Sequence, residues 1–331
     1  MSARRLARQR GVAVITALLL TTLAVTIVAS LFWQQQVQVR SMENQRLHLQ
    51  TKWILRGALD WAALVLRQDG MDNTRYTSLD QVWATPLAET RLDQYIERER
   101  VQGEVFDATL SGSIVDATSR YNLRNLADNG APMPADVAIF RRLLQNLQID
   151  PALADRAAAA VASSQTPPPT QGPAGGSGAP PGPQPVVQST AKPMALTQLD
   201  DLLAVPGFTL DMVARLREYA IVLPVRTSVN VNTAPPEVIA AVIENYSVSE
   251  ANALVVRRKQ APFQDISYFN AMLGSERTTV NGAAAVRSDY FLVLSRVRLD
   301  RAALDAEALI ARVAVVPGGP SGATVLWVRQ N

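Results

Sequence analysis

The sequence contains no cysteine and only one histidine, His48, in 331 residues. Without cysteine the chain can form no disulfide scaffold, thiolate zinc site, iron–sulfur centre or cysteine nucleophile. The absence does not assign a compartment, because periplasmic proteins without disulfides are common. Any serine–histidine chemistry would have to use His48, which lies in a helical pattern where a surface or packing role is expected.

Catalytic motifs are also missing. The sequence has no P-loop, dinucleotide-binding fingerprint, nucleophile elbow or metal-ligand spacing. Asp200 and Asp201 are adjacent carboxylates, but neighbouring positions of a helix diverge by about 100° and do not converge on one substrate. We therefore expect no catalytic residues, no enzymatic activity, no cofactor and no metal site.

Charge is scarce, at 18% of residues, and unevenly placed. Four arginines within the first ten residues exceed the net charge of +3, so the rest of the chain is close to neutral. The isoelectric point of about 9.4 is therefore no sign of nucleic-acid binding. Since 48% of residues are hydrophobic, the chain can bury one or two sizeable cores, and wholesale disorder is excluded.

One long uncharged run follows the arginines. No charge occurs between Arg10 and Arg40, and residues 12–33 are long enough to cross a bilayer as a helix. Basic residues before the run place the amino terminus in the cytoplasm. A cleaved secretory signal is the alternative, with small residues at 28–30, but such a signal has an apolar region of only about 7 to 15 residues. We expect a single-pass protein of the bacterial inner membrane with a periplasmic carboxyl-terminal domain.

The helical pattern continues beyond the membrane. From Met42 to Val65 apolar residues recur at helical spacing, and no proline or glycine interrupts the chain before Gly57. The pattern predicts one helix from the membrane to about Leu66, with its second half packed on a globular domain.

The amino-terminal residues resemble a type IV prepilin-class signal. The matching features are the basic leader, Gly11 at the cleavage position, Val12 as first mature residue and the apolar run after it. Glycine before the scissile bond permits close approach of a protease. The resemblance implies cleavage by a prepilin peptidase after Gly11 and N-methylation of Val12.

The fifth mature position departs from that signal. Most pilin-like proteins carry glutamate there, whereas this chain has Thr16. A carboxylate in lipid is costly unless it is paired, and in this family it is thought to pair with the amine of a neighbouring subunit. Threonine suits a terminal subunit that has no such partner. The alternative, in which Thr16 only hydrogen-bonds within its own helix, stays open.

The soluble part is predicted to be α+β. Short strands are expected at residues 104–107 and 113–116 with a turn at Ser111 and Gly112, followed near the carboxyl end by strands at 289–299, 308–316 and 323–329. The middle of the chain is helical instead, with helices expected at 135–147, 151–162, 197–204, 210–220, 235–244, 250–259 and 266–272. Residues 166–185 hold eight prolines and five glycines, so a disordered loop is expected over 165–190.

Three segments and the leader resemble a known family, general secretion pathway protein K, the large minor pseudopilins of type II secretion systems. The segments are residues 113–126, 192–207 and 228–239, in the family order. The resemblance implies a long amino-terminal helix on a mostly antiparallel sheet, interrupted by a large all-α domain of SAM-like or helix-hairpin-helix-like type. It divides the chain into a leader (1–11), a transmembrane part (12–33), a pilin-like first part (34–125), the inserted domain (126–286) and carboxyl-terminal strands (287–331).

The same resemblance implies a function in protein export. Such a subunit caps or initiates the pseudopilus tip, and its partners are the minor pseudopilins I and J, other pseudopilins, the prepilin peptidase, the secretin and exported proteins. The family also has an acidic, calcium-linked segment after the second inserted helix. Here Arg156 and the Pro/Gly-rich loop take its place, with no charge up to Lys192, so we expect the calcium site to be absent.

A DNA-binding protein of a DNA-uptake or type IV pilus system is the alternative. Residues 230–239 followed by Arg257, Arg258 and Lys259 resemble membrane-anchored helix-hairpin-helix proteins. However, the hairpin at 245–249 lacks glycine, and residues 193–280 hold nine acidic and seven basic residues. That charge balance predicts no nucleic-acid binding, and the three basic residues are interpreted as a solvated helix end.

Overall fold

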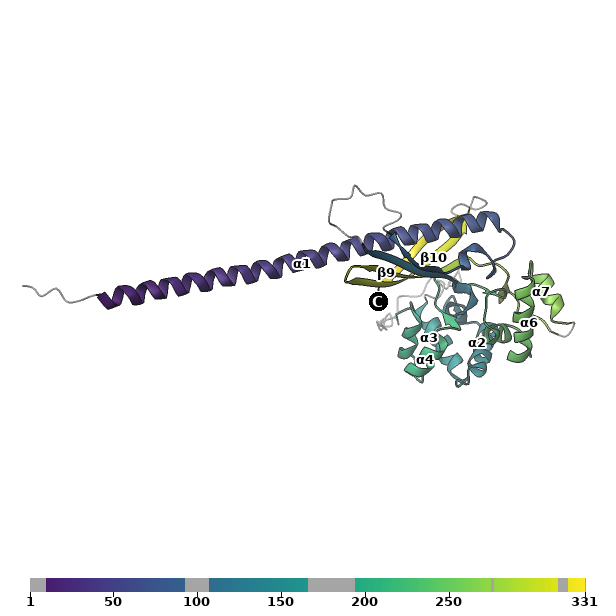
Figure 1. Cartoon of the computed structure of the whole chain (residues 1–331). Helices are drawn as coiled ribbons and strands as arrows, with labels where there is room; N and C mark the ends of the chain where they lie inside the picture. The colour runs from purple at the N-terminus through teal and green to yellow at the C-terminus, as the bar shows by residue number, and fades with distance from the viewer. Residues whose placement is uncertain (1–9, 93–106, 166–193, 275–276, 315–320, 331) are drawn as a thin grey trace, which may run out of the picture.

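A computed structural model describes residues 10–92, 107–165, 194–274, 277–314 and 321–330. Its longest element, helix α1 (Arg10–Asp72), has 63 residues and is therefore about 95 Å long. Its first half projects away from everything else, and its second half lies on the head of the molecule (Figure 1). The helix continues six residues past the predicted end, because Leu66 and Asp69 still face the protein interior. Of the residues expected as leader, only Arg10 and Gly11 are described.

The head contains a five-stranded sheet, which α1 covers on one face. Its strands lie in the order β1-β2-β9-β10-β11, and all neighbours are antiparallel. The core between helix and sheet includes Leu55, Leu59 and Leu66 from α1 and Phe291 and Ile310 from the sheet. The predicted α+β class is confirmed. The strands are β1 (Leu87–Arg91), β2 (Ala108–Asp116), β9 (Tyr290–Leu299), β10 (Ala302–Ala314) and β11 (Ser321–Gln330).

The turn predicted at Ser111 and Gly112 was wrong, because both residues lie in the middle of β2. A side chain on Gly112 would bring its Cβ to 2.5 Å from the carbonyl oxygen of Leu294 in β9. The glycine therefore permits close approach of two strands instead of marking a turn. Of the first strand predicted there, only Asp107 is described, and β2 lies between β1 and β9.

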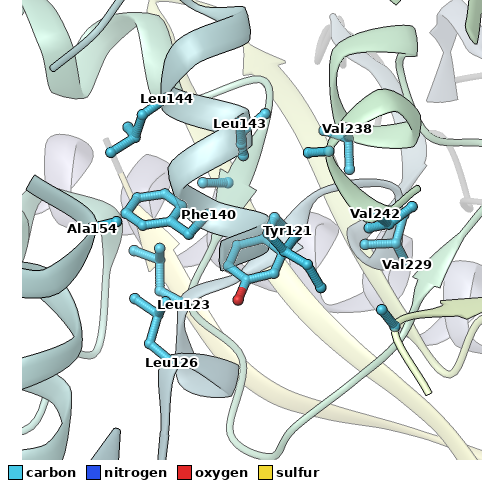
Figure 2. Close-up of a cluster of buried hydrophobic side chains, with 14 of the residues drawn as sticks. Tyr121, Leu123, Leu126, Phe140, Leu143, Leu144, Ala154, Val229, Val238 and Val242 are labelled. Atoms are coloured by element: carbon cyan, nitrogen blue, oxygen red, sulfur yellow. The ribbon is translucent and has the colours of Figure 1, made fainter. Parts of the chain in front are cut away.

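Between β2 and β9 the chain forms a mainly helical domain with its own core (Figure 1). Phe140 and Leu143 of α2 meet Tyr121, Leu123 and Val238 there (Figure 2). The predicted Pro/Gly-rich loop lies outside the described residues, apart from Gln165. The helices are α2 (Pro134–Asn146), α3 (Leu153–Ser164), α4 (Leu210–Leu216), α5 (Pro236–Val242), α6 (Val248–Gln260) and α7 (Ile266–Met272), with a 3-10 helix over Leu199–Ala204.

Capping explains where the predicted helix starts were right or wrong. Helix α4 begins after Thr209, as predicted, and α7 has the predicted bounds. Helix α6 starts two residues earlier than predicted, because Ser247 and Glu250 form a capping box. Thr233, three residues before α5, does not cap that helix; its hydroxyl donates to Asp116.

Candidate functional site

The membrane half of α1 contacts nothing else in the described chain. Over its most apolar window α1 has a mean hydropathy of 2.5 with none of that window buried, and it is the one described helix apolar and long enough to span a membrane. Val12 is 64% exposed and Trp33 is 73% exposed. Because so much apolar surface is unfavourable in water, this segment requires lipid or other protein helices around it.

Gly11 and Val12 lie in the first turn of α1. Residues 1–9 lie outside the described part of the chain, so cleavage after Gly11 stays a prediction from the sequence.

The hydroxyl of Thr16 bonds within its own helix, as the alternative interpretation predicted. Its hydroxyl lies 3.0 Å from the carbonyl oxygens of both Val12 and Ala13. The hydroxyl therefore donates to a carbonyl oxygen of the same helix. In lipid, Thr16 needs no hydrogen-bond partner from another subunit. The hydroxyl of Thr16 is thus satisfied within its own helix.

Beyond residue 40, the outward side of α1 exposes a row of apolar side chains among charged ones such as Arg46 and Asp60. We call this the outer stripe: it consists of Met42, Leu49, Trp53, Trp61, Leu64 and Met71, all half or more exposed. Trp53 is 69% exposed, whereas Leu55 and Leu59 on the opposite side face the sheet. Two solvent-facing tryptophans and a row of aliphatic side chains are typical of a protein–protein contact surface.

A groove of about 240 Å³ lies beside the outer stripe, between α1 and strands β1, β2 and β9. Trp61 borders both features, and Gly112 and Ile114 of β2 line the groove. No charged residue is among the lining residues. The groove therefore adds an uncharged surface next to Trp61, formed by the helix and the sheet.

A buried polar network joins the sheet to the inserted domain. Asp116 at the end of β2 accepts hydrogen bonds from Asn230 and Thr233 of the inserted domain and from Ser288 just before β9. Asp116 and Asn230 belong to the segments that carry the family resemblance, but sequence reasoning gave them no role. It also missed Arg312, which forms a buried ion pair with Asp69 of α1 at 2.5 Å. The signal available was an arginine at an inward position in the otherwise apolar second half of β10, residues 308–314.

One of the three basic residues at the end of α6 is bound within the protein. The guanidinium of Arg258 donates to the carbonyl oxygens of Val231 and Ala234, at 2.8 and 2.6 Å. Burial lowers the pKa of Arg258 to about 10. The interpretation of all three residues as a solvated helix end was thus wrong for Arg258, whereas Arg257 and Lys259 are exposed.

The amino terminus of α6 is closed to phosphate as well. In helix-hairpin-helix proteins this position would offer backbone N–H groups to an anion. Here the Glu250 carboxylate accepts hydrogen bonds from the backbone and hydroxyl of Ser247, which lowers the pKa of Glu250 to about 2. A second anion would meet this negative charge.

Metal ligation finds no support among the described residues, which contain no group of three His, Asp or Glu side chains placed to hold an ion. His48 is exposed on α1. Near the start of α3, the guanidinium of Arg156 donates to the carbonyl of Pro206 at 3.1 Å. The family resemblance implies calcium in the segment that follows this helix. Residues 157–165 contain no carboxylate, so the described residues there do not fit a calcium ion.

Comparison with known proteins identifies the family. Family models of type II secretion system protein K match residues 119–225 and 229–288. The protein K of Pseudomonas aeruginosa is 32% identical over 306 residues, which is 88% of this chain and 85% of that protein. The protein K of Pectobacterium carotovorum is 27% identical over 309 residues, covering 88% and 89% of the two chains.

A solved structure shares the fold. It is the GspK-GspI-GspJ complex of enterotoxigenic Escherichia coli, in which the matched chain is 18% identical with a TM-score of 0.57. The match covers 88% of this chain and 99% of the other. With the identity to the Pseudomonas protein, the resemblance seen in the sequence is confirmed: the chain belongs to the type II secretion system protein K family.

Proposed function

We propose that this chain is the minor pseudopilin at the tip of a type II secretion pseudopilus, processed after Gly11 and methylated on Val12. The observation that carries the proposal is the unpartnered apolar surface of α1. This surface covers all sides of the helix over residues 12–33 and continues as the outer stripe up to Met71. Large exposed apolar side chains on α1 beyond residue 40, Trp53 and Trp61 among them, favour a protein neighbour there in addition to those within the membrane.

The neighbours proposed are the helices of the minor pseudopilins I and J. The related chain from enterotoxigenic Escherichia coli was solved in complex with GspI and GspJ. In our proposal those helices lie along the membrane half of α1 and the outer stripe, and other pseudopilins follow below. Trp53 and Trp61 would supply most of the contact area, because large aromatic side chains dominate such interfaces.

The inserted domain supports a role as cap and initiator. It lies at the end of α1 that is far from the membrane (Figure 1). Its bulk would block a further subunit from adding above, while growth below pushes the chain toward the secretin and exported proteins. The role is mechanical, without catalysis or a cofactor.

The test is intact mass spectrometry of the protein recovered from the membrane fraction of its host. The expected species begins at Val12 and carries one added methyl group. A chain beginning at Leu31 would indicate ordinary secretion, and an uncleaved chain a static membrane anchor. Either of these two results would overturn the proposal.

A further inference from the structure

We infer that Asp116 is a positioning residue that locks the orientation of the inserted domain on the sheet, so that the tip and the shaft of this subunit move as one body. The contacts between the described residues support this lock by themselves. Only its consequence, the transmission of thrust from α1 to the tip, rests on the proposed function.

The need for a lock follows from the separation of the cores. The inserted domain buries its side chains around Phe140 and Val238, whereas α1 and the sheet share a different core around Leu66 and Phe291. Between them lies a third, smaller cluster, in which Ile221 contacts residues of the sheet. Apolar contacts are non-directional, so this small cluster alone would allow the domains to shift against each other.

The carboxylate of Asp116 makes directional hydrogen bonds that fix the orientation of the inserted domain on the sheet. One oxygen accepts from the backbone N–H and the hydroxyl of Thr118, both at 2.8 Å. The other accepts from the amide of Asn230 at 3.0 Å and from the hydroxyls of Thr233 and Ser288, both at 2.5 Å. Thr118 and Ser288 lie where the chain enters and leaves the inserted domain, whereas Asn230 and Thr233 lie within it. Asp116 and these four residues are all buried. Charged acceptors form the stronger hydrogen bonds, with defined geometry.

The same point is tied to the end of α1. Arg312 of β10 donates to Asp69 at 2.5 Å, to the hydroxyl of Thr77 at 2.8 Å and to the carbonyl of Ser288 at 2.9 Å. Its guanidinium lies 4.6 Å from the ring centre of Phe291. Ser288 therefore connects the α1 ion pair with the Asp116 network. Helix, sheet and inserted domain are thus held by one continuous chain of directional contacts.

The absence of cysteine makes the lock measurable. Exposed Gln68 on α1 and exposed Lys259 on α6 are replaced as Gln68→Cys and Lys259→Cys in the full chain, which is spin-labelled in detergent. Pulsed electron paramagnetic resonance then gives the distance distribution between the labels. We expect one narrow distribution. With Asp116→Asn added, a donor amide faces the hydrogen-bond donors, and we expect about a doubling of the width or a second distance.

The control is Asp305→Asn, which removes an exposed sheet carboxylate paired with Arg296 and should leave the distribution narrow. If Asp116→Asn does not fold by circular dichroism, the combined Ser288→Ala and Thr233→Val variant removes two donors and should broaden the distribution. An unchanged narrow distribution in a folded Asp116→Asn chain, or in the combined variant where that one does not fold, overturns the inference. Amino-terminal processing does not enter this measurement, so failure of the proposed function would be seen separately.

Discussion

The membrane half of α1 and the inserted domain are both rich in aliphatic residues, yet they use them in opposite ways. Leu18 is 59% exposed, whereas Leu143 is fully buried. The difference lies in what surrounds each leucine in the sequence. Residues 12–33 carry no charged face, so no side of that helix is suited to water, and the whole surface is left for lipid and partner helices. In α2, polar and apolar residues alternate at helical spacing, so one side closes a core within the chain.

The second half of α1 combines both behaviours. Leu55, Leu59 and Leu66 belong to the subunit's own core, while the side chains of the outer stripe are exposed. The inserted domain therefore buries its apolar side chains within the chain itself. The second half of α1 buries one side and exposes the other, and the first half depends on surrounding lipid or protein helices. Each part of this comparison can be broken by a single substitution.

Processing should respond most strongly. Replacing Gly11→Leu should leave nearly all of the protein at full length in the inner membrane and abolish secretion, because a bulky side chain obstructs the protease at the scissile bond. Immunoblotting of membrane fractions and assay of exported protein measure both effects. Ala17→Leu, inside the apolar run, is the matched control and should be processed normally. Normal processing of Gly11→Leu would contradict the prepilin interpretation.

The self-sufficient core should be broken by Phe140→Ala. The ring is fully buried and stacks on Tyr121 with centroids 5.7 Å apart, so its loss should lower the free energy of unfolding by about 3–5 kcal/mol. Denaturant unfolding followed by circular dichroism measures this change. Leu210→Ala, at an exposed position, should change the value by less than about 0.5 kcal/mol. An equal effect of the two variants would mean that Phe140 is not a core residue.

The outer stripe should show the reverse behaviour. Trp53→Glu should reduce co-purification of the partner pseudopilins at least about tenfold, since it places a charge at the centre of an apolar contact. The free energy of unfolding should change by less than about 0.5 kcal/mol, because the side chain is exposed. Asn252→Glu, exposed on α6, introduces the same charge away from the stripe and should retain the partners. Retention of partners by Trp53→Glu would exclude the stripe as the interface.

A smaller effect is expected at Glu250, whose capping box holds the start of α6. Because hydrogen bonds from Ser247 lower its pKa to about 2 in the folded chain, the carboxylate stabilises the fold above its unfolded pKa of about 4.3. This stabilisation is lost as the pH falls through about 2. Glu250→Gln should lower the Tm at pH 7 by no more than about 3 °C and should reduce its dependence on pH between 4 and 2. A pH profile identical to that of the native chain would contradict the assignment.

Calcium should have the smallest effect of all. A site with a Kd one hundredth of the added calcium concentration would stabilise the fold by about 2.7 kcal/mol, a shift of several degrees. We expect the Tm with added calcium and with a chelator to agree within about 1 °C. A calcium-dependent rise would show that a site exists and that the loss of acidic residues after α3 was misinterpreted.

Local pattern was sufficient for much of the fold. The spacing of apolar residues predicted α1 and its path onto a globular head, and helix α7 has the predicted bounds. The carboxyl-terminal strands were also predicted, although β10 begins at Ala302 instead of residue 308. These elements depend on contacts or capping residues that lie close together in the sequence, so the sequence displays them directly.

The sequence by itself indicated an uncharged helix long enough to span a membrane and a helical insertion between strands. Its three motif segments and leader also indicated the family. The tertiary structure alone decided that Gly112 is a point of close strand approach, that Thr233 serves Asp116 and not α5, and that Arg312 pairs with Asp69 across 243 residues of sequence. These features depend on which distant segments meet in the interior, and a buried charge acquires its partner only when the fold brings that partner to it.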